Sequence, residues 1–290
     1  MAAVEELSEP DDLTADEREA VQHQLFRLAD DEFVVAERYT EWQVKAPTLE
    51  SDLAFSNIAQ DELGHARLWY DLLQDWGAEE SELIWERDPS EWRHSTLAEL
   101  PFDEGDWADP VLRSYLYDVA EDIQLRALQD SSYPRIRDRV GKILGEEDYH
   151  REHAANWLER LCEEEESRAR VQDALDRLFP HALTLFAPTD EAVEERIDEL
   201  GIRSEPLVTM REEWLDEVIP FLESLGLSVD DAELPEQYDV HHSQLELPEH
   251  TGRDQSHTDA WFDLHDDFTH TYQELGRTSA ERIMKDPDDE

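Results

Sequence analysis

The sequence contains little positive charge. Its 290 residues include 76 aspartates and glutamates against 25 lysines and arginines, a formal net charge of −51, and the only lysines are Lys45, Lys142 and Lys285. Such a surface disfavours nucleic acid and anionic membranes as partners. Disorder is a common outcome of extreme charge, but 39% hydrophobic residues and 9 tryptophans indicate a packed core. We therefore expect a folded protein whose solvated acidic surface suits high salt.

Cysteine, long apolar runs and glycine-rich motifs are scarce or absent. Cys162 is the single cysteine, which excludes an internal disulfide framework and favours a reducing cytoplasm. The glutamates at 163–166 should raise the pKa of its thiol and exclude it as a nucleophile. No signal-peptide or membrane-spanning run is visible. Because flavin, nicotinamide and cysteine-cluster fingerprints are missing, any redox chemistry needs electrons from another protein.

Two apolar helical stripes are present, and each is interrupted by a glutamate and a histidine. The first stripe consists of Phe55, Ile58, Glu62, His65, Trp69 and Leu72. The second consists of Ile136, Val140, Ile143, Glu147, His150, Ala154, Trp157 and Leu161. Spacings of three and four residues place each set on one helix face, which should point at a core. A carboxylate and an imidazole are costly there unless they are paired or bind an ion.

Two Glu-x-x-His helices, each with a glutamate from a preceding helix, are typical of di-iron or di-manganese sites in ferritin-like bundles. Pro47 is expected in the turn between the first two helices. Glu32 and Glu62 both lie about 15 residues from it, so they should be level in an antiparallel hairpin. Glu121 and Glu147 both lie about 13 residues from Pro134 in the second turn, so they should face each other in the same way. The predicted metal ligands are Glu32, Glu62, His65, Glu121, Glu147 and His150.

Several alternatives stay open at this stage. Asp31 or Glu37 could replace Glu32 as the first-helix ligand, since helix boundaries read from sequence shift by several residues. His153 is expected beside the site or exposed. Candidate hydrogen-bond partners of the ligand imidazoles are Asp61, Asp118 and Asn57. The competing interpretation is a buried polar network that fixes the bundle register without any ion.

No β-type alternation recurs, so the expected fold is all-α: a ferritin-like four-helix bundle with additional C-terminal helices. We expect a single domain over residues 1–290, with a mobile acidic tail at 1–15, the core bundle at 15–162 and accessory helices at 163–290. The bundle helices are predicted at 15–44, 47–76, 109–132 and 134–162. Further helices are predicted to begin near residues 171, 192, 211 and 254, with a loop at 227–250.

The hairpin EWQVKAPTLESDLAFSNIAQDELGHARLWYDLL, residues 41–73, resembles the C-type subunits of ring 1,2-phenylacetyl-CoA epoxidases. The similarity continues through 143–161, 178–188, 201–215 and 253–268. Several long segments in one order are more specific than either Glu-x-x-His motif. The scarcity of lysine also resembles proteins of salt-accumulating archaea.

This resemblance implies a subunit of a multicomponent complex that makes an epoxide on the aromatic ring of phenylacetyl-CoA in aerobic phenylacetate breakdown. In that family a related A-type subunit carries the catalytic di-iron centre, with a reductase and small accessory subunits as further partners. The C-type subunit pairs with the A-type subunit and can lack a working metal site. The resemblance therefore implies a structural partner of the catalytic subunit.

Three hypotheses follow from the sequence. The first is a phenylacetyl-CoA epoxidase subunit, whose own di-iron centre and own activity stay open. The second is a stand-alone di-iron oxidase or oxygenase that uses its own glutamates and histidines. The third is a metal-free scaffold protein.

Overall fold

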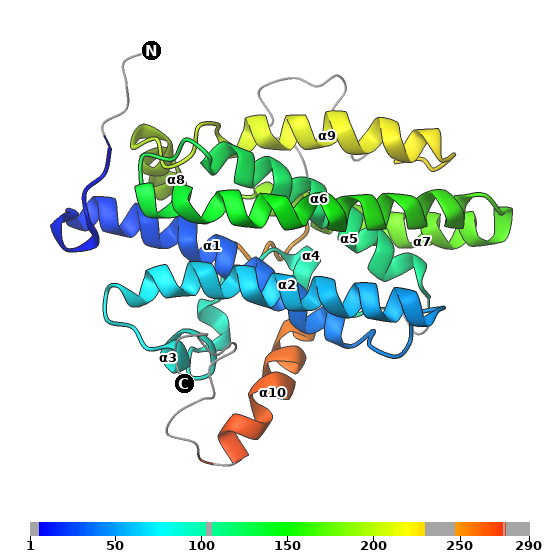
Figure 1. Ribbon diagram of the computed structural model, residues 1–290, viewed down its shortest axis with the longest axis horizontal. Helices are drawn as coiled ribbons and strands as arrows, with labels where there is room; N and C mark the ends of the chain where they lie inside the picture. The colour runs from blue at the N-terminus through cyan, green and yellow to red at the C-terminus, as the bar shows by residue number, and fades with distance from the viewer. Residues whose placement is uncertain (1–5, 103–105, 230–246, 275, 277–290) are drawn as a thin grey trace.

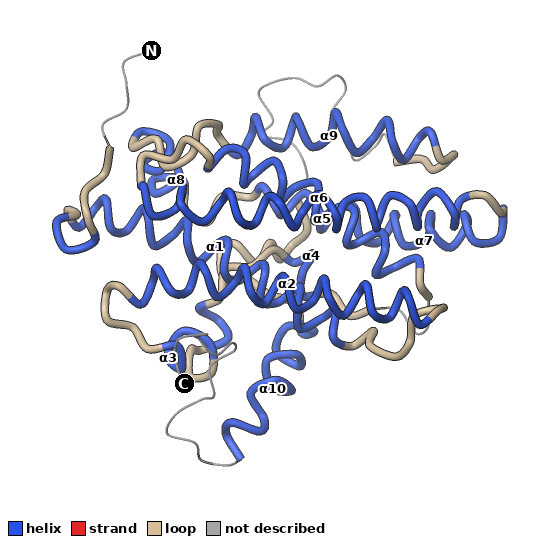
Figure 2. Tube along the Cα trace, in the orientation of Figure 1, coloured by secondary structure: helices blue, strands red, loops and turns tan. Residues whose placement is uncertain are grey.

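The computed structural model describes residues 6–102, 106–229, 247–274 and 276. Four long helices form the bundle in Figure 1: α1 (Ala15–Thr40), α2 (Leu49–Gln74), α5 (Ala108–Leu128) and α6 (Pro134–Cys162). Helix α1 packs against α2, α5 packs against α6, and α2 also contacts α6. In the described part of the chain every regular element is helical and none is a strand (Figure 2). The predicted all-α bundle is thus confirmed.

Local sequence determines where these helices begin. Thr14 and Glu17 form a capping box at α1, because the Thr14 hydroxyl accepts from the Glu17 amide at 3.3 Å and the Glu17 carboxylate accepts from the Thr14 amide at 2.8 Å. The Thr48 hydroxyl caps α2 by accepting from the Ser51 amide at 3.1 Å. Pro134 occupies the first turn of α6, where a missing amide hydrogen costs nothing.

Several predicted boundaries differ from the structure; α2 is two residues shorter at each end, and α5 ends at Leu128 rather than near residue 132. Helix α1 ends at Thr40 rather than near Val44, because Val44 adopts a φ of 63°, a left-handed conformation that a helix cannot contain. Helix α5 begins at Ala108, so Asp109 lies inside its first turn instead of capping it. There the Asp109 carboxylate lies 3.4 Å from the Arg113 guanidinium.

The remaining elements surround the bundle. They are α3 (Glu80–Ile84), α4 (Thr96–Glu99), α7 (Glu165–Ala182), α8 (Glu191–Glu199), α9 (Leu207–Ser224), α10 (Asp259–Glu274) and the 3-10 turns Pro10–Asp12, Pro89–Glu91 and Leu183–Phe186. Helices α7 and α9 pack on α5, and α8 packs on α1. Helix α10 points away from the bundle (Figure 1). Helices α7 and α9 begin earlier than predicted, α10 begins later, and most of the predicted loop at 227–250 lies outside the described residues.

The N-terminal segment contacts the bundle over its described part. Leu7 and Leu13 are buried, and the Leu7 amide donates to the Ser132 carbonyl at 2.8 Å. These contacts differ from the mobile tail expected over residues 1–15, because two apolar side chains in an acidic segment find places on the core. Residues 1–5 lie outside the described part. None of the described helices combines the length and apolar character needed to cross a bilayer.

Candidate metal centre

The six predicted ligand residues converge at the centre of the bundle. Glu32 comes from α1, Glu62 and His65 from α2, Glu121 from α5, and Glu147 and His150 from α6; all are buried. Ligand atoms that lie within 4.8 Å of one another belong to Glu32, Glu62, His65 and Glu121, and again to Glu62, Glu147 and His150. Because Glu62 belongs to both groups, the groups adjoin, as two neighbouring ion sites would.

The Nδ1 atoms of both imidazoles face these carboxylates. His65 Nδ1 lies 3.4 Å from both Glu32 Oε2 and Glu147 Oε1. His150 Nδ1 lies 3.1 Å from Glu147 Oε1 and 3.5 Å from Glu62 Oε1. Most of these separations exceed an ordinary hydrogen bond. Glu147 thus lies against both imidazoles, whereas Glu32 faces His65 and Glu62 faces His150.

The other nitrogen of each ring is held from outside the centre. His65 Nε2 lies 2.7 Å from Glu146 Oε2 on α6, and His150 Nε2 lies 3.4 Å from Asp61 Oδ2 on α2. A carboxylate that accepts from Nε2–H fixes the ring orientation, so Nδ1 would be the nitrogen that binds an ion once it has lost its proton. Each Glu-x-x-His helix thus orients the imidazole of the other.

Asp61 was a predicted partner of a ligand imidazole, whereas Glu146 was missed. Both residues directly precede the glutamate of a Glu-x-x-His motif. The repeated motif therefore begins with an acidic residue directly before each Glu-x-x-His. This repetition is the sequence signal from which Glu146 could have been predicted.

Many ligand atoms at the centre have no hydrogen-bond partner among the described residues. They are Oε2 of Glu32, both carboxylate oxygens of Glu62, Glu121 and Glu147, and Nδ1 of His65 and His150. Buried polar atoms are rarely left in this state, because desolvation without a partner costs about 1–3 kcal/mol each and more for charged groups. A register-fixing polar network would satisfy these atoms internally. Their arrangement fits a pair of cations instead.

The electrostatics of the site support the same conclusion. Burial and repulsion from Glu147 and Glu32 raise the pKa of Glu62 well above its usual range. Burial opposes a charge on His65, but Glu32, Glu147 and Glu146 outweigh it and raise its pKa to about 9. Burial likewise opposes a charge on His150, yet Asp61 and Glu147 raise its pKa to about 10. In the absence of an ion, protons provide the positive charge that the centre requires.

The alternative first-helix ligands lie elsewhere. Asp31 is bound by the Arg253 guanidinium and accepts from the Ser95 amide at 2.7 Å, so its carboxylate is already satisfied. Glu37 is half-buried and belongs to neither ligand group; burial, Asp267 and Glu41 raise its pKa to about 7. Glu32 was favoured because it lies as far from the first turn as Glu62 does, and Glu32 is the residue that lies in the ligand group.

The remaining candidates have different surroundings. Asn57 is exposed, so it does not buttress an imidazole as proposed. Asp118 is buried beside the site, accepts from the Ser114 hydroxyl at 2.7 Å, and has its pKa raised to about 8 by burial and Glu147. His153 is half-buried, and burial and His150 lower its pKa to about 4. The buried Cys162 thiol has a raised pKa because of burial rather than the neighbouring glutamates.

Fold and donor set together define the class of ferritin-like bundles in which glutamates and Glu-x-x-His pairs line a central ion site. The Phenylacetic acid catabolic protein family matches residues 1–275, and the chain belongs to this family. It is 32% identical over 206 residues to the C-type subunit of the 1,2-phenylacetyl-CoA epoxidase of Escherichia coli (strain K12), covering 70% of this chain and 81% of that protein. It is 26% identical over 236 residues to the A-type subunit of the same enzyme, covering 80% and 76%.

Proposed function

We propose that this chain is the C-type subunit of a monooxygenase complex that epoxidises the aromatic ring of phenylacetyl-CoA. The observation that carries the proposal is the 32% identity to a C-type relative, which exceeds the 26% identity to an A-type relative over comparable shares of the chain. The family match over residues 1–275 supports a part in phenylacetic acid catabolism without distinguishing the two types of subunit. Its partners are then a reductase, small accessory subunits and a related A-type subunit.

The buried centre would hold a pair of iron ions in this chain. Glu32, Glu62, His65, Glu121, Glu147 and His150 supply carboxylate and imidazole donors, a set that suits iron, and their ligand atoms converge. When bound, an iron pair supplies dioxygen activation with electrons from a partner. The chain's own residues neutralise the ions and orient the donors, and the surrounding apolar core excludes water.

We assign the chain the role of structural partner, because the resemblance implies that the A-type subunit carries catalysis. The bound ions would then stabilise this bundle and the surface it presents to its partner. The net charge of −51 and the scarcity of lysine support a high-salt cytoplasm as the cellular location of the protein.

Co-purification tests the assignment. Expressed with its A-type relative and purified through a tag on either chain at molar salt, the two should elute together by size exclusion. With reductase added, the pair should oxidise phenylacetyl-CoA in the presence of dioxygen, and this chain alone should not. Separate elution would contradict the complex. Turnover by this chain without an A-type partner would support the stand-alone oxidase, which the complete ligand set keeps as the second candidate.

A further inference from the structure

A second buried cluster of metal-type donors lies outside the centre of the bundle and was not anticipated from sequence. It consists of His94, Glu99 at the end of α4, and His257 shortly before α10, and none of the three side chains is exposed. One ligand atom of each residue lies within 4.8 Å of the other two. Two imidazoles and a carboxylate form a donor set that binds zinc and other late transition metals.

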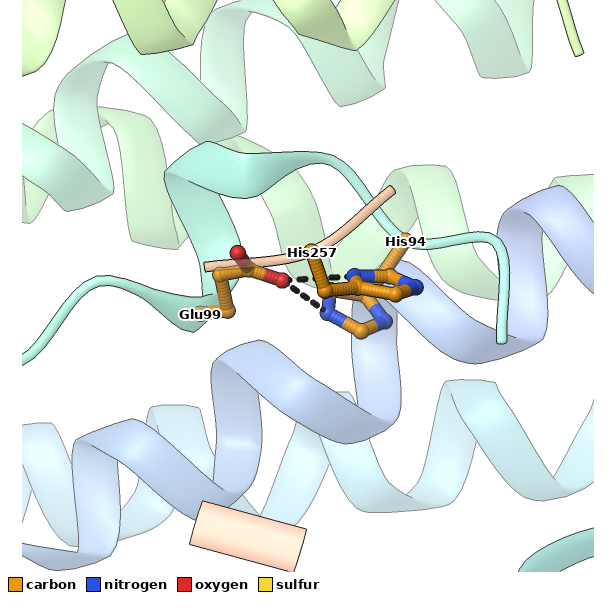
Figure 3. Close-up of side chains that lie close together, drawn as sticks. All are labelled: His94, Glu99 and His257. Atoms are coloured by element: carbon orange, nitrogen blue, oxygen red, sulfur yellow. Dashed lines mark hydrogen bonds and ion pairs between the residues drawn. The ribbon is translucent and has the colours of Figure 1, made fainter. Parts of the chain in front are cut away.

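Both imidazoles direct one ring nitrogen at the same atom of Glu99. His94 Nε2 and His257 Nδ1 each lie 2.7 Å from Glu99 Oε2, and both rings lie on the same side of the carboxylate (Figure 3). The rings stack with centroids 4.4 Å apart and an interplanar angle of 24°. The three donor atoms thus converge on one small region of the interior, as ligands of a single ion do.

The outer atoms of His257 and Glu99 are held by backbone groups. His257 Nε2 lies 3.0 Å from the Trp92 carbonyl oxygen, which can only accept, so this nitrogen carries a hydrogen. The Thr258 amide donates to Glu99 Oε1 at 2.7 Å. Metal-binding histidines and carboxylates commonly have their outer atoms fixed in this way, because it directs the inner atoms at the ion.

The inner atoms lack a positive charge. In a neutral His257 ring the hydrogen on Nε2 leaves a lone pair on Nδ1, which then faces the Glu99 carboxylate oxygen. Two electron-rich atoms this close repel each other in a buried site unless a cation lies between them. His94 is available as a neutral ligand, because burial lowers its pKa to about 4. One divalent cation would supply the missing charge and engage all three donors.

The spacing of the donors is near that of an occupied site. Donors about 2.1 Å from a tetrahedral ion lie about 3.4 Å from each other, so each 2.7 Å contact would lengthen by less than about 1 Å on binding. A small rotation about the side-chain torsions of Glu99 provides a shift of that size. Full burial of all three side chains favours a structural ion over one that meets a substrate.

The cluster joins two segments that are far apart in sequence. Two of its residues belong to the connection between α2 and α5, and the third precedes α10. Trp261 Nε1 donates to the Pro89 carbonyl at 2.8 Å, and an added Cβ at Gly252 would clash with the His94 carbonyl oxygen. Residues 251–261 therefore pack along this connection, and the cluster lies between these contacts.

We propose that His94 Nε2, Glu99 Oε2 and His257 Nδ1 bind one zinc ion, with water as the fourth ligand, and that this ion fastens residues 251–261 to the connection between α2 and α5. The site goes beyond the proposed function and does not depend on it. Binding is coordination alone: a proton held between the donors leaves to solvent, and no electron is transferred. Because the unfolded chain does not bring the donors together, the ion stabilises the fold.

The zinc content of the full chain tests the site. After incubation with ZnCl₂ in molar KCl and dialysis, His257→Gln should hold one zinc per chain fewer than the parent, whatever ions the bundle centre holds. His265→Gln is the matched control, because His265 is a buried histidine that contacts the rings of Trp92 and Trp261 but belongs to none of the ligand groups in the described part of the chain. It should hold as much zinc as the parent. Parental zinc content in His257→Gln would overturn the proposal.

Anomalous diffraction from crystals of the parent protein soaked in ZnCl₂ gives a test that does not depend on variants folding. A peak at the zinc edge should lie about 2.0–2.2 Å from each of the three donor atoms and apart from any peak at the bundle centre. Added zinc should also slow hydrogen exchange of peptides within 251–261 in the metal-free parent and leave it unchanged in His257→Gln. Absence of a peak between the donors, with their 2.7 Å contacts retained, would overturn the site in favour of hydrogen bonds only.

Discussion

Glu146 on α6 reaches across the bundle to His65 on α2, with 2.7 Å between Glu146 Oε2 and His65 Nε2. The contact joins a half-exposed carboxylate to a buried ring whose Nδ1 faces Glu32 and Glu147. A single hydrogen bond therefore links the solvent-exposed surface of the bundle to the imidazole of a predicted metal ligand. The residue is also a sensitive place to test the metal centre without removing a ligand.

Replacing Glu146 with Ala should weaken metal binding by about 10–100-fold, because the His65 ring loses the acceptor that fixes its tautomer and orientation. Affinity for Mn²⁺ or anaerobic Fe²⁺ can be measured by calorimetry on the purified chain. Asp148→Ala is the control, since Asp148 is an exposed carboxylate on the same helix. Equal affinity in both variants would count against an ion held by His65.

The metal-free protein should lose stability at both ends of the pH scale. His65 and His150 have folded pKa values raised to about 9 and 10, so their stabilisation is complete below about 6.5 and lost as pH rises through those values. His94 and His153 have pKa values lowered to about 4, so stability is complete above about 6.5 and falls as pH drops toward 4. Thermal midpoints measured at constant salt should therefore peak near pH 6.5 and fall on both sides of it. A flat profile would contradict these shifts.

The bundle and its centre were predictable because their signals are local and periodic. A three-four stripe places Glu62 and His65 on one buried face, and prolines at two turns set the level of Glu32 and Glu121 on neighbouring helices. The geometry of the helix alone converts such spacing into convergence. Metal occupancy stays a prediction.

A second buried cluster, His94 with Glu99 and His257, could not be predicted in this way. Glu99 at the end of the four-residue helix α4 and His257 in an irregular segment are separated by 158 positions, and no helical period relates them. Arg253 pairs with Asp31 across a gap of 222 positions. The left-handed Val44 was equally hidden, because a β-branched residue rarely adopts a positive φ.

Low salt should destabilise the protein. A formal charge of −51 repels itself more strongly when the Debye length grows from about 3 Å at 1 M to about 10 Å at 0.1 M. The thermal midpoint by circular dichroism should thus fall on dialysis from molar to 0.1 M KCl. An uncharged osmolyte at equal osmolality serves as the control for water activity. An identical midpoint at both salt concentrations would argue against the high-salt adaptation and leave the fold assignment untouched.

Gly252→Ala should be strongly destabilising, by roughly 2 kcal/mol or more. Gly252 has a φ of 75°, and its new Cβ would lie 1.9 Å from a backbone oxygen, which cannot move aside as a side chain can. Gly145→Ala is the matched control, since nothing lies within 4 Å of its added Cβ and alanine favours a helix by up to about 1 kcal/mol. Denaturant unfolding of both variants measures the contrast. Equal free energies of unfolding would show that the backbone at Gly252 does not pack closely against His94.

Replacing His65 and His150 together with Ala should remove the bound metal and leave turnover by the complex largely intact. Both Nδ1 atoms would be lost from the centre, so the remaining carboxylates could no longer hold two ions. Catalysis should persist because the proposed role of this chain is structural. Metal per chain, dioxygen-dependent oxidation of phenylacetyl-CoA and co-elution with the A-type partner are measured on the same preparation, with Asp148→Ala as the control. Turnover abolished while co-elution stays normal would instead assign the chemistry to the four helices of this chain.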